Sequence, residues 1–262
     1  MSSNMHRRNE LIGNQDTSFL KYMALLLMLV DHIGAAFFPG VIELRIIGRM
    51  AFPLYAWCLV VGSVRTHSPF QYLLRLLCMA LLCQPLYMMA LGAKWKDLNI
   101  LFTLTVALLA IIGIRARFWG SQFWMPMLCF YLLGIMKVDY DWRGVLFILV
   151  LYFCRSSKAG LITAYLVYAL YWGVLSSSVT QIFGISLMPL FKLPGLGKVA
   201  EAFFKLQGMV WLSLPLIVIP MKTKLRMTKW LGYALYPLHL VFLVLLKLLC
   251  GVAPQAILAP FT

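Results

Sequence analysis

Residues 22–54 read YMALLLMLVDHIGAAFFPGVIELRIIGRMAFPL and contain two long apolar runs separated by a short Phe-Pro-Gly turn. The first run carries Asp31 and His32 side by side, and the second opens with Arg45 and Arg49. Charged side chains are costly in the hydrocarbon core of a bilayer, so those found there usually pair with one another or serve a function. We therefore expect a helical hairpin around which the rest of the chain is organised.

The composition indicates a membrane protein. The 262-residue chain is 63% hydrophobic and only 12% charged, which is too apolar for a soluble domain of this length. The apolar runs are continuous rather than alternating, which argues against a β-barrel. The sequence predicts an all-α, polytopic transmembrane bundle of about nine spans, with eight to ten as the range. The expected spans are 19–38, 50–64, 72–91, 99–114, 122–136, 143–154, 160–176, 206–220 and 230–249.

The same pattern predicts the domain organisation. We expect a polar cytoplasmic tail at 1–18, one transmembrane bundle over 19–250 and a C-terminal tail at 251–262. Residues 177–205 are rich in proline and glycine, which favours a re-entrant or interfacial segment; a tenth span is the alternative.

The net charge of +15 is spread over many short loops, so it indicates helix orientation and argues against nucleic-acid binding. A cytoplasmic N-terminus places more Lys and Arg on the cytoplasmic side, with the strongest contribution from MKTKLRMTK at 221–229. This orientation puts Asp31 and His32 in the outer half of their span and Arg49 at the outer end of the next one.

His32 is the first candidate for chemistry, because imidazole titrates near neutral pH. Adjacent residues on a helix point about 100° apart, so Asp31 is expected to pair with Arg49 on the facing helix rather than with His32. Arg45 and Arg49 share a helix face because they are spaced i, i+4. The alternatives are a hydrogen-bonded structural histidine and a snorkelling interfacial arginine.

Three further sets of polar residues lie within the apolar runs. Asn99 and Thr103 are spaced i, i+4 and form a polar stripe, while Tyr236 and His239 are suited to holding a substrate amine or hydroxyl. Arg75 is a candidate phosphate ligand near the cytoplasmic side. Interhelical hydrogen bonding, packing and topological anchoring are the structural alternatives. The spacing of the four histidines supplies no ligand set, so no metal site is predicted.

Five motifs occur in order along most of the chain: VDHIG, IGRMAFPLYAW, LNILFTLT, VDYDWRGVL and YALYPLHLVFL. In order and spacing they resemble the TraX family of conjugation-associated membrane proteins. The resemblance implies a bacterial inner-membrane acetyltransferase that uses cytosolic acetyl-CoA and modifies the amino terminus of a conjugative pilin on the outer side. It implies that His32 is the catalytic histidine, and it also marks Asp31, Arg49, Asn99, Tyr140, Gly144, Tyr236, His239 and, less directly, Arg75.

These expectations combine into one mechanism. His32 acts as general base on the acceptor or transiently takes the acetyl group itself, while Asp31 and Arg49 hold the site together. Arg49, Asn99 or Tyr236 stabilises the developing oxyanion. An O-acetyltransferase for a cell-envelope glycan, a proton-coupled transporter and a scaffold protein are the alternatives. A transporter more often shows paired repeats, and none stands out in the sequence.

Overall fold

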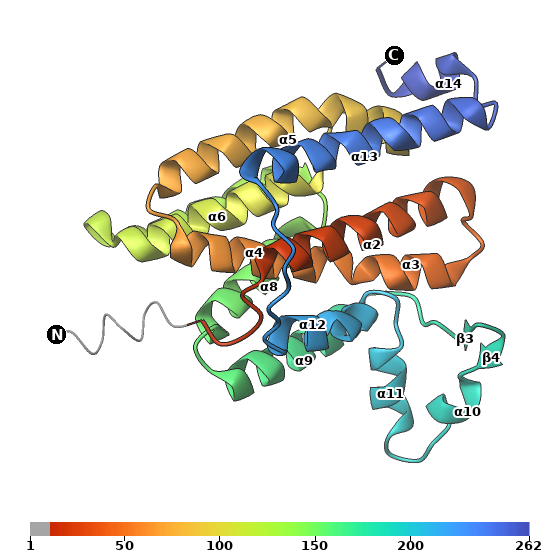
Figure 1. Cartoon of the computed structure of the whole chain (residues 1–262). Coiled ribbons are helices and arrows are strands. Elements are labelled where there is room, and N and C mark those ends of the chain that lie inside the picture. The colour runs from red at the N-terminus through yellow and green to blue at the C-terminus, as the bar shows by residue number, and fades with distance from the viewer. Residues whose placement is uncertain (1–10, 175, 262) are drawn as a thin grey trace. The chain divides into compact units, whose positions relative to one another are not determined.

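The computed structural model describes residues 11–174 and 176–261, so positions 1–10 of the expected N-terminal tail lie outside the described residues (Figure 1). Most of the described chain is helical. The helices are α2 (Thr17–Phe37), α3 (Ile42–Arg49), α4 (Ala51–Arg65), α5 (Pro69–Leu91), α6 (Ile100–Ala116), α7 (Ser121–Ile135), α8 (Asp141–Cys154), α9 (Lys158–Val174), α10 (Met188–Phe191), α11 (Gly197–Phe203), α12 (Leu214–Val218), α13 (Lys229–Leu249) and α14 (Pro254–Leu258). Short elements connect them, namely the 3₁₀ turns η1 (Phe118–Gly120), η2 (Gly208–Ser213) and η3 (Ala259–Phe261) and the strands β1 (Asp97–Leu98), β2 (Lys137–Val138), β3 (Gln181–Ile182) and β4 (Ile185–Ser186).

Several helices begin and end at residues with recognisable capping chemistry. Asp16, Asn99 and Thr228 are the N-caps of α2, α6 and α13, and each side chain accepts a backbone N–H of the first turn. Pro69 opens α5, where its missing N–H costs nothing, and Gly92 ends that helix in the left-handed conformation with φ 68°. Local sequence therefore favours these helix boundaries.

Within the described residues, four helices are long and apolar enough to cross a membrane: Thr17–Phe37, Ile42–Arg65, Pro69–Leu91 and Trp230–Leu249. The membrane-helix character expected from the composition is thus present. The other predicted spans fall on shorter helical segments, so the number of nine spans stays a prediction.

The second span begins earlier than the sequence indicated. Helices α3 and α4 meet at Met50, which keeps a right-handed helical backbone with φ −70° and ψ −20°. The continuous stretch Ile42–Arg65 therefore includes Arg45 and Arg49, which the sequence placed at its outer edge. The two arginines lower the local hydropathy, which is why the apolar run seemed to start only at residue 50.

The chain forms two compact units, and each unit combines segments that are distant in sequence. The first comprises Met1–Cys58 with Phe153–Arg226, and the second comprises Leu59–Tyr152 with Met227–Thr262. The chain passes from one unit to the other within α4, within α8 and in the loop before α13.

In the first unit, the residues just before α2 are fixed by hydrogen bonds. The Asn14 N–H donates to the Ile217 carbonyl oxygen at 2.7 Å, and the Trp57 Nε1–H donates to the Asn14 carbonyl oxygen at 2.7 Å. Asn14 and Trp57 are fully buried. The described part of the expected polar tail is therefore packed against the helices and fixes the start of α2.

Helix α9 and the chain around η2 approach each other closely in the same unit. A Cβ atom at Gly173 would lie 2.3 Å from the Ala202 carbonyl oxygen, and one at Gly208 would lie 2.5 Å from that same oxygen. The buried Tyr165 hydroxyl donates to the Val210 carbonyl oxygen at 2.9 Å. The two glycines thus give α9, α11 and η2 the space to pack together.

Residues 177–205 of the first unit form no long helix. They contain the antiparallel pair β3–β4, the four-residue α10 and the seven-residue α11. The turn between the strands places Phe183 and Gly184 at positive φ, 47° and 79°. None of these described elements is long enough to span a membrane, so none of them forms the tenth span that was the alternative.

In the second unit, α5 and α6 are joined by a buried network around Gln84 and Asn99. The Asn99 side-chain amide donates to Gln84 Oε1 and to the Ala80 carbonyl oxygen, each at 2.9 Å. Gln84 in turn donates to the Asp97 carbonyl oxygen at 2.9 Å. Asn99 is fully buried and Gln84 is 4% exposed. This network fixes the start of α6 against the middle of α5.

We predict that Asn99→Ala lowers the free energy of unfolding by about 1–3 kcal/mol, because it removes a helix cap and leaves Gln84 Oε1 buried with fewer donors. Unfolding in mixed detergent micelles, followed by circular dichroism, measures the change. Asn99→Ser is the matched control, since its hydroxyl oxygen keeps a helix cap while the amide donors are lost, and its stability should fall between those of the wild type and Asn99→Ala. An Asn99→Ala protein as stable as the wild type would show that the network contributes nothing.

Candidate functional site

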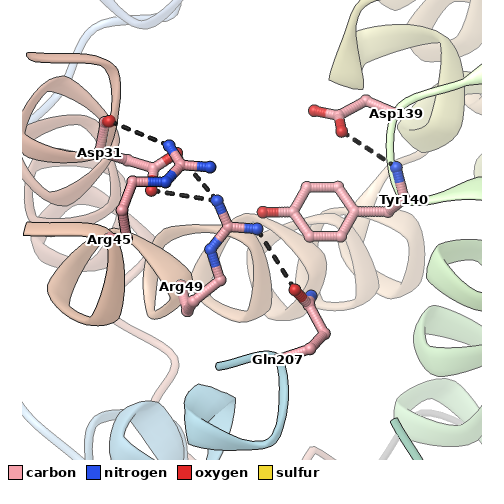
Figure 2. A network of polar contacts seen from close by, with 6 residues as sticks. All are labelled: Asp31, Arg45, Arg49, Asp139, Tyr140 and Gln207. Carbon is pink, nitrogen blue, oxygen red and sulfur yellow. Dashed lines mark hydrogen bonds and ion pairs between the residues drawn. The ribbon is translucent and has the colours of Figure 1, made fainter. Parts of the chain in front are cut away.

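Asp31 on α2 is held by two arginines from α3. Arg49 Nη2 lies 3.1 Å from both carboxylate oxygens of Asp31, and Arg45 Nη1 lies 2.9 Å from Oδ2. Arg45 Nη1 also donates to the Asp31 carbonyl oxygen at 3.1 Å. Figure 2 shows both guanidinium groups reaching the carboxylate. The expected Asp31–Arg49 pair is confirmed, and Arg45 is a second partner. We call Asp31, Arg45 and Arg49 the arginine–aspartate cluster.

Two glycines bring α2 and α3 close enough for this cluster to form. A Cβ atom at Gly48 would lie 2.2 Å from both the Cβ and Oδ1 atoms of Asp31. A Cβ atom at Gly34 would lie 2.7 Å from the Leu44 Cβ. Because both contacts are far inside van der Waals distance, only glycine fits at these two positions. Gly48 thus creates the space that the Asp31 side chain occupies.

The cluster is largely shielded from solvent and carries a net positive charge. The side chains of Asp31 and Arg49 are each 12% exposed, and that of Arg45 is 28% exposed. Two guanidinium groups face one carboxylate, so the three side chains together carry one positive charge in excess. In a medium of low dielectric constant such a charge acts strongly on a nearby anion or developing oxyanion.

His32 follows Asp31 on α2, half-buried, with its Nδ1 atom shielded from solvent. The charges of Arg45 and Arg49 both act on it electrostatically. The residue expected to carry the chemistry therefore lies beside the cluster, within a candidate span.

Gln207 makes a contact with Arg49 that the sequence did not predict. Its Oε1 atom accepts a hydrogen bond from Arg49 Nη1 at 3.3 Å (Figure 2). Its backbone N–H donates to Ser176 Oγ at 3.0 Å. Gln207 lies at the start of the expected span 206–220 and far from Arg49 in sequence, so only the fold reveals the pairing.

The second unit holds the remaining predicted residues. Both amide hydrogens of Asn99 are used in the network described above, and Thr103 Oγ1 donates to the Asp139 carbonyl oxygen. Asn99 thus makes the interhelical hydrogen bonds expected of the structural alternative, while Thr103 bonds the loop between β2 and α8. The Asp139 side chain also accepts the Tyr140 N–H at 3.1 Å (Figure 2), and Tyr140 has a left-handed backbone with φ 65°.

Tyr236 and His239 lie on one face of α13, as their spacing predicts. Their ring centroids are 4.9 Å apart in an edge-to-face arrangement, and the two residues are 6% and 5% exposed.

The Gly144 N–H donates to the Tyr140 carbonyl oxygen at 2.9 Å, which begins α8. Arg75 is exposed on α5. The roles of Asn99, Tyr236, His239 and Arg75 in binding substrates stay predictions, as does their approach to His32.

Comparison with known proteins decides the family. The model of the TraX protein family matches residues 16–247, which is most of the chain and reaches from the cap of α2 to the last turn of α13. The chain belongs to the TraX family. The match includes the hairpin with His32 and the arginine–aspartate cluster as well as the polar network of the second unit.

One curated relative has a name that bears on function. The chain is 29% identical over 180 residues to the probable fimbrial assembly protein FimC, serogroup H1, of Dichelobacter nodosus, a match that covers 63% of this chain and 72% of that protein. No solved structure matches the chain significantly.

We predict that Gly48→Ala lowers the free energy of unfolding by about 1–3 kcal/mol, because the added methyl group must displace Asp31 or separate α2 from α3. The measurement is again unfolding in detergent micelles. Gly134→Ala is the matched control: Gly134 lies in α7 and a Cβ there meets nothing within 4 Å. That variant should be neutral or slightly stabilising. Equal stability of the two variants would contradict the close approach of the two helices.

Proposed function

We propose that this TraX family member is an integral inner-membrane acetyltransferase. It moves an acetyl group from cytosolic acetyl-CoA to an amine at the outer side of the membrane, and the amino terminus of a pilin is the favoured acceptor. The observation that supports this proposal most is the position of the arginine–aspartate cluster beside His32, inside a candidate span. Such a set of ionisable groups is costly in hydrocarbon and is typical of a functional centre.

His32 is the proposed general base. The acceptor nitrogen attacks the thioester carbonyl carbon while a neutral imidazole takes the proton from that nitrogen. The carbon–sulfur bond then breaks, coenzyme A leaves as the thiol after taking a proton, and the acetyl group remains on the acceptor as an amide. In a variant of this mechanism, His32 carries the acetyl group between the two substrates.

The arginine–aspartate cluster is the proposed electrostatic partner of His32. A negative charge develops on the thioester carbonyl oxygen during attack, and preorganised donors aimed at such a charge are a large source of catalysis. The cluster has one positive charge in excess and is held rigidly, because Asp31 binds both Arg45 and Arg49. Asp31 is thus the proposed positioning residue for the two arginines.

The proposed acceptor rests on the family and on its named relative. The resemblance to the TraX family implies pilin acetylation, and the similar Dichelobacter protein is named for fimbrial assembly. Both support a pilin-type acceptor. The exposed Arg75 on α5 is the proposed ligand for the phosphates of acetyl-CoA.

The test uses the purified full-length protein in lipid nanodiscs with labelled acetyl-CoA and a pilin amino-terminal peptide. We expect coenzyme A release that depends on the peptide and a mass increase at its amino terminus. His32→Ala should lower the rate by about 10²–10⁴-fold while the protein still inserts and folds. His67→Ala is the matched control, since His67 is exposed between α4 and α5.

Three outcomes would count against the proposal. A wild-type rate for His32→Ala would exclude His32 as the base. Transfer to a glycan hydroxyl and not to the peptide amine would establish the O-acetyltransferase alternative. Wild-type protein that neither binds acetyl-CoA nor releases coenzyme A would favour a transporter or a scaffold.

A further inference from the structure

The segment from β3 to α11 exposes several large apolar side chains. It comprises residues 181–203 of the first unit, and its helices are too short to span a bilayer. Six large apolar side chains there are more than 40% exposed: Phe183 (74%), Ile185 (69%), Met188 (43%), Leu193 (47%), Leu196 (68%) and Val199 (49%). Apolar exposure on this scale marks a surface that contacts a protein or a lipid.

This segment is attached to the beginning of a candidate span. The Phe183 N–H donates to Glu43 Oε1 at 2.8 Å, and Glu43 lies in the first turn of Ile42–Arg65. Ile42 and Ile182 pack against a buried cluster formed by Ile46, Val179 and Met209. The β3–β4 turn is therefore fixed to the first turns of that span by both polar and apolar contacts.

The length of the span places this attachment near the membrane surface. Ile42–Arg65 contains 24 residues. At about 1.5 Å per residue it is roughly 36 Å long, against about 30 Å of hydrocarbon. Its first turn, with Glu43, thus lies at the boundary between hydrocarbon and water. A segment bound to that turn lies at the same level, where exposed apolar side chains meet lipid headgroups and the upper acyl chains.

The charges of the segment fit that environment. Lys192 and Lys198 are exposed among the apolar side chains, and Glu201, the acidic residue of this segment, accepts a hydrogen bond from Ser178 Oγ at 2.7 Å. Lysine beside aromatic and aliphatic side chains is the composition of interfacial elements, in which the ammonium groups meet lipid phosphates. The excess of positive charge favours an anionic surface over a neutral one.

We propose that residues 181–199 are a membrane-interface anchor that inserts Phe183 and Ile185 below the headgroups and binds anionic lipid phosphates through Lys192 and Lys198. The anchor also bears on the proposed site. The chain that leaves α11 reaches Gln207, which binds Arg49, so α3 is held at Glu43 and again at Arg49 by the same part of the chain. This anchoring stands independently of the acetyltransferase reaction.

The test measures where the segment lies in a bilayer. Nitroxide spin labels are attached to Phe183→Cys and Ile185→Cys in the full-length protein, in a background where Cys78, Cys154 and Cys250 are serine. Lys224→Cys, in an exposed loop of the same unit, is the matched control. In nanodiscs containing phosphatidylglycerol we expect both anchor labels to show several-fold higher accessibility to oxygen, relative to a water-soluble nickel complex, than the label at position 224. Replacing both Lys192 and Lys198 by glutamine should reduce that difference.

Labels at 183 and 185 that are as accessible to the nickel complex as the label at 224 would overturn the proposal. The proposal would also fail if the labels lost nickel accessibility only after addition of a pilin peptide, because that result identifies the acceptor as the occupant. If the protein fails to transfer acetyl groups while the labels at 183 and 185 keep their high oxygen accessibility, the acetyltransferase proposal fails and the anchor proposal stands.

Discussion

A carboxylate in a membrane-spanning helix needs positive charge within contact distance, and this requirement at Asp31 organises the first unit. Burying an unpaired ion costs several kcal/mol even after the protein relaxes, whereas a well-hydrogen-bonded partner offsets most of that cost. Arg45 and Arg49 satisfy the requirement from one face of α3. Gly34 and Gly48 provide the close helix approach that their short contacts need. The hairpin is therefore specified by charge and by side-chain size at the same time.

Helix α3 is joined to another part of the first unit near both of its ends. Arg49 also binds Gln207, and Glu43 binds the backbone of Phe183, so the irregular segment between α9 and α12 is joined to α3 at two points. A helix held in this way keeps its guanidinium groups fixed relative to His32 on α2. Such preorganisation fits the proposed acetyltransferase site, because fixed donors need no reorganisation when charge develops.

The sequence predicted those features that depend on local pattern. The spacing of Arg45 and Arg49, together with the short turn between two apolar runs, was enough to predict the pairing of Arg49 with Asp31. The 14-residue α8 likewise matches the short apolar run predicted at 143–154. The contribution of Gly48 and the contact from Gln207 could not be predicted, because both depend on how closely separate elements approach. The proline- and glycine-rich segment before α12 has no periodicity, so its strands and short helices were also beyond prediction.

The polar network of Gln84 and Asn99 shows why residue type alone does not establish a binding role: both amide hydrogens of Asn99 are used within the protein.

A double-mutant cycle between Asp31 and Arg49 tests the central interaction most directly. Unfolding in detergent micelles is measured for the wild type, Asp31→Asn, Arg49→Gln and the double variant. We expect Arg49→Gln to be clearly destabilising in the wild type but much less so when Asp31 is already asparagine, because the two arginines then face no carboxylate and removal of one relieves their repulsion. A coupling free energy of about 0.5–3 kcal/mol is the expected range for side chains in direct contact. Equal costs of Arg49→Gln in the two backgrounds would contradict the conclusion that the Asp31 charge holds α3 in place.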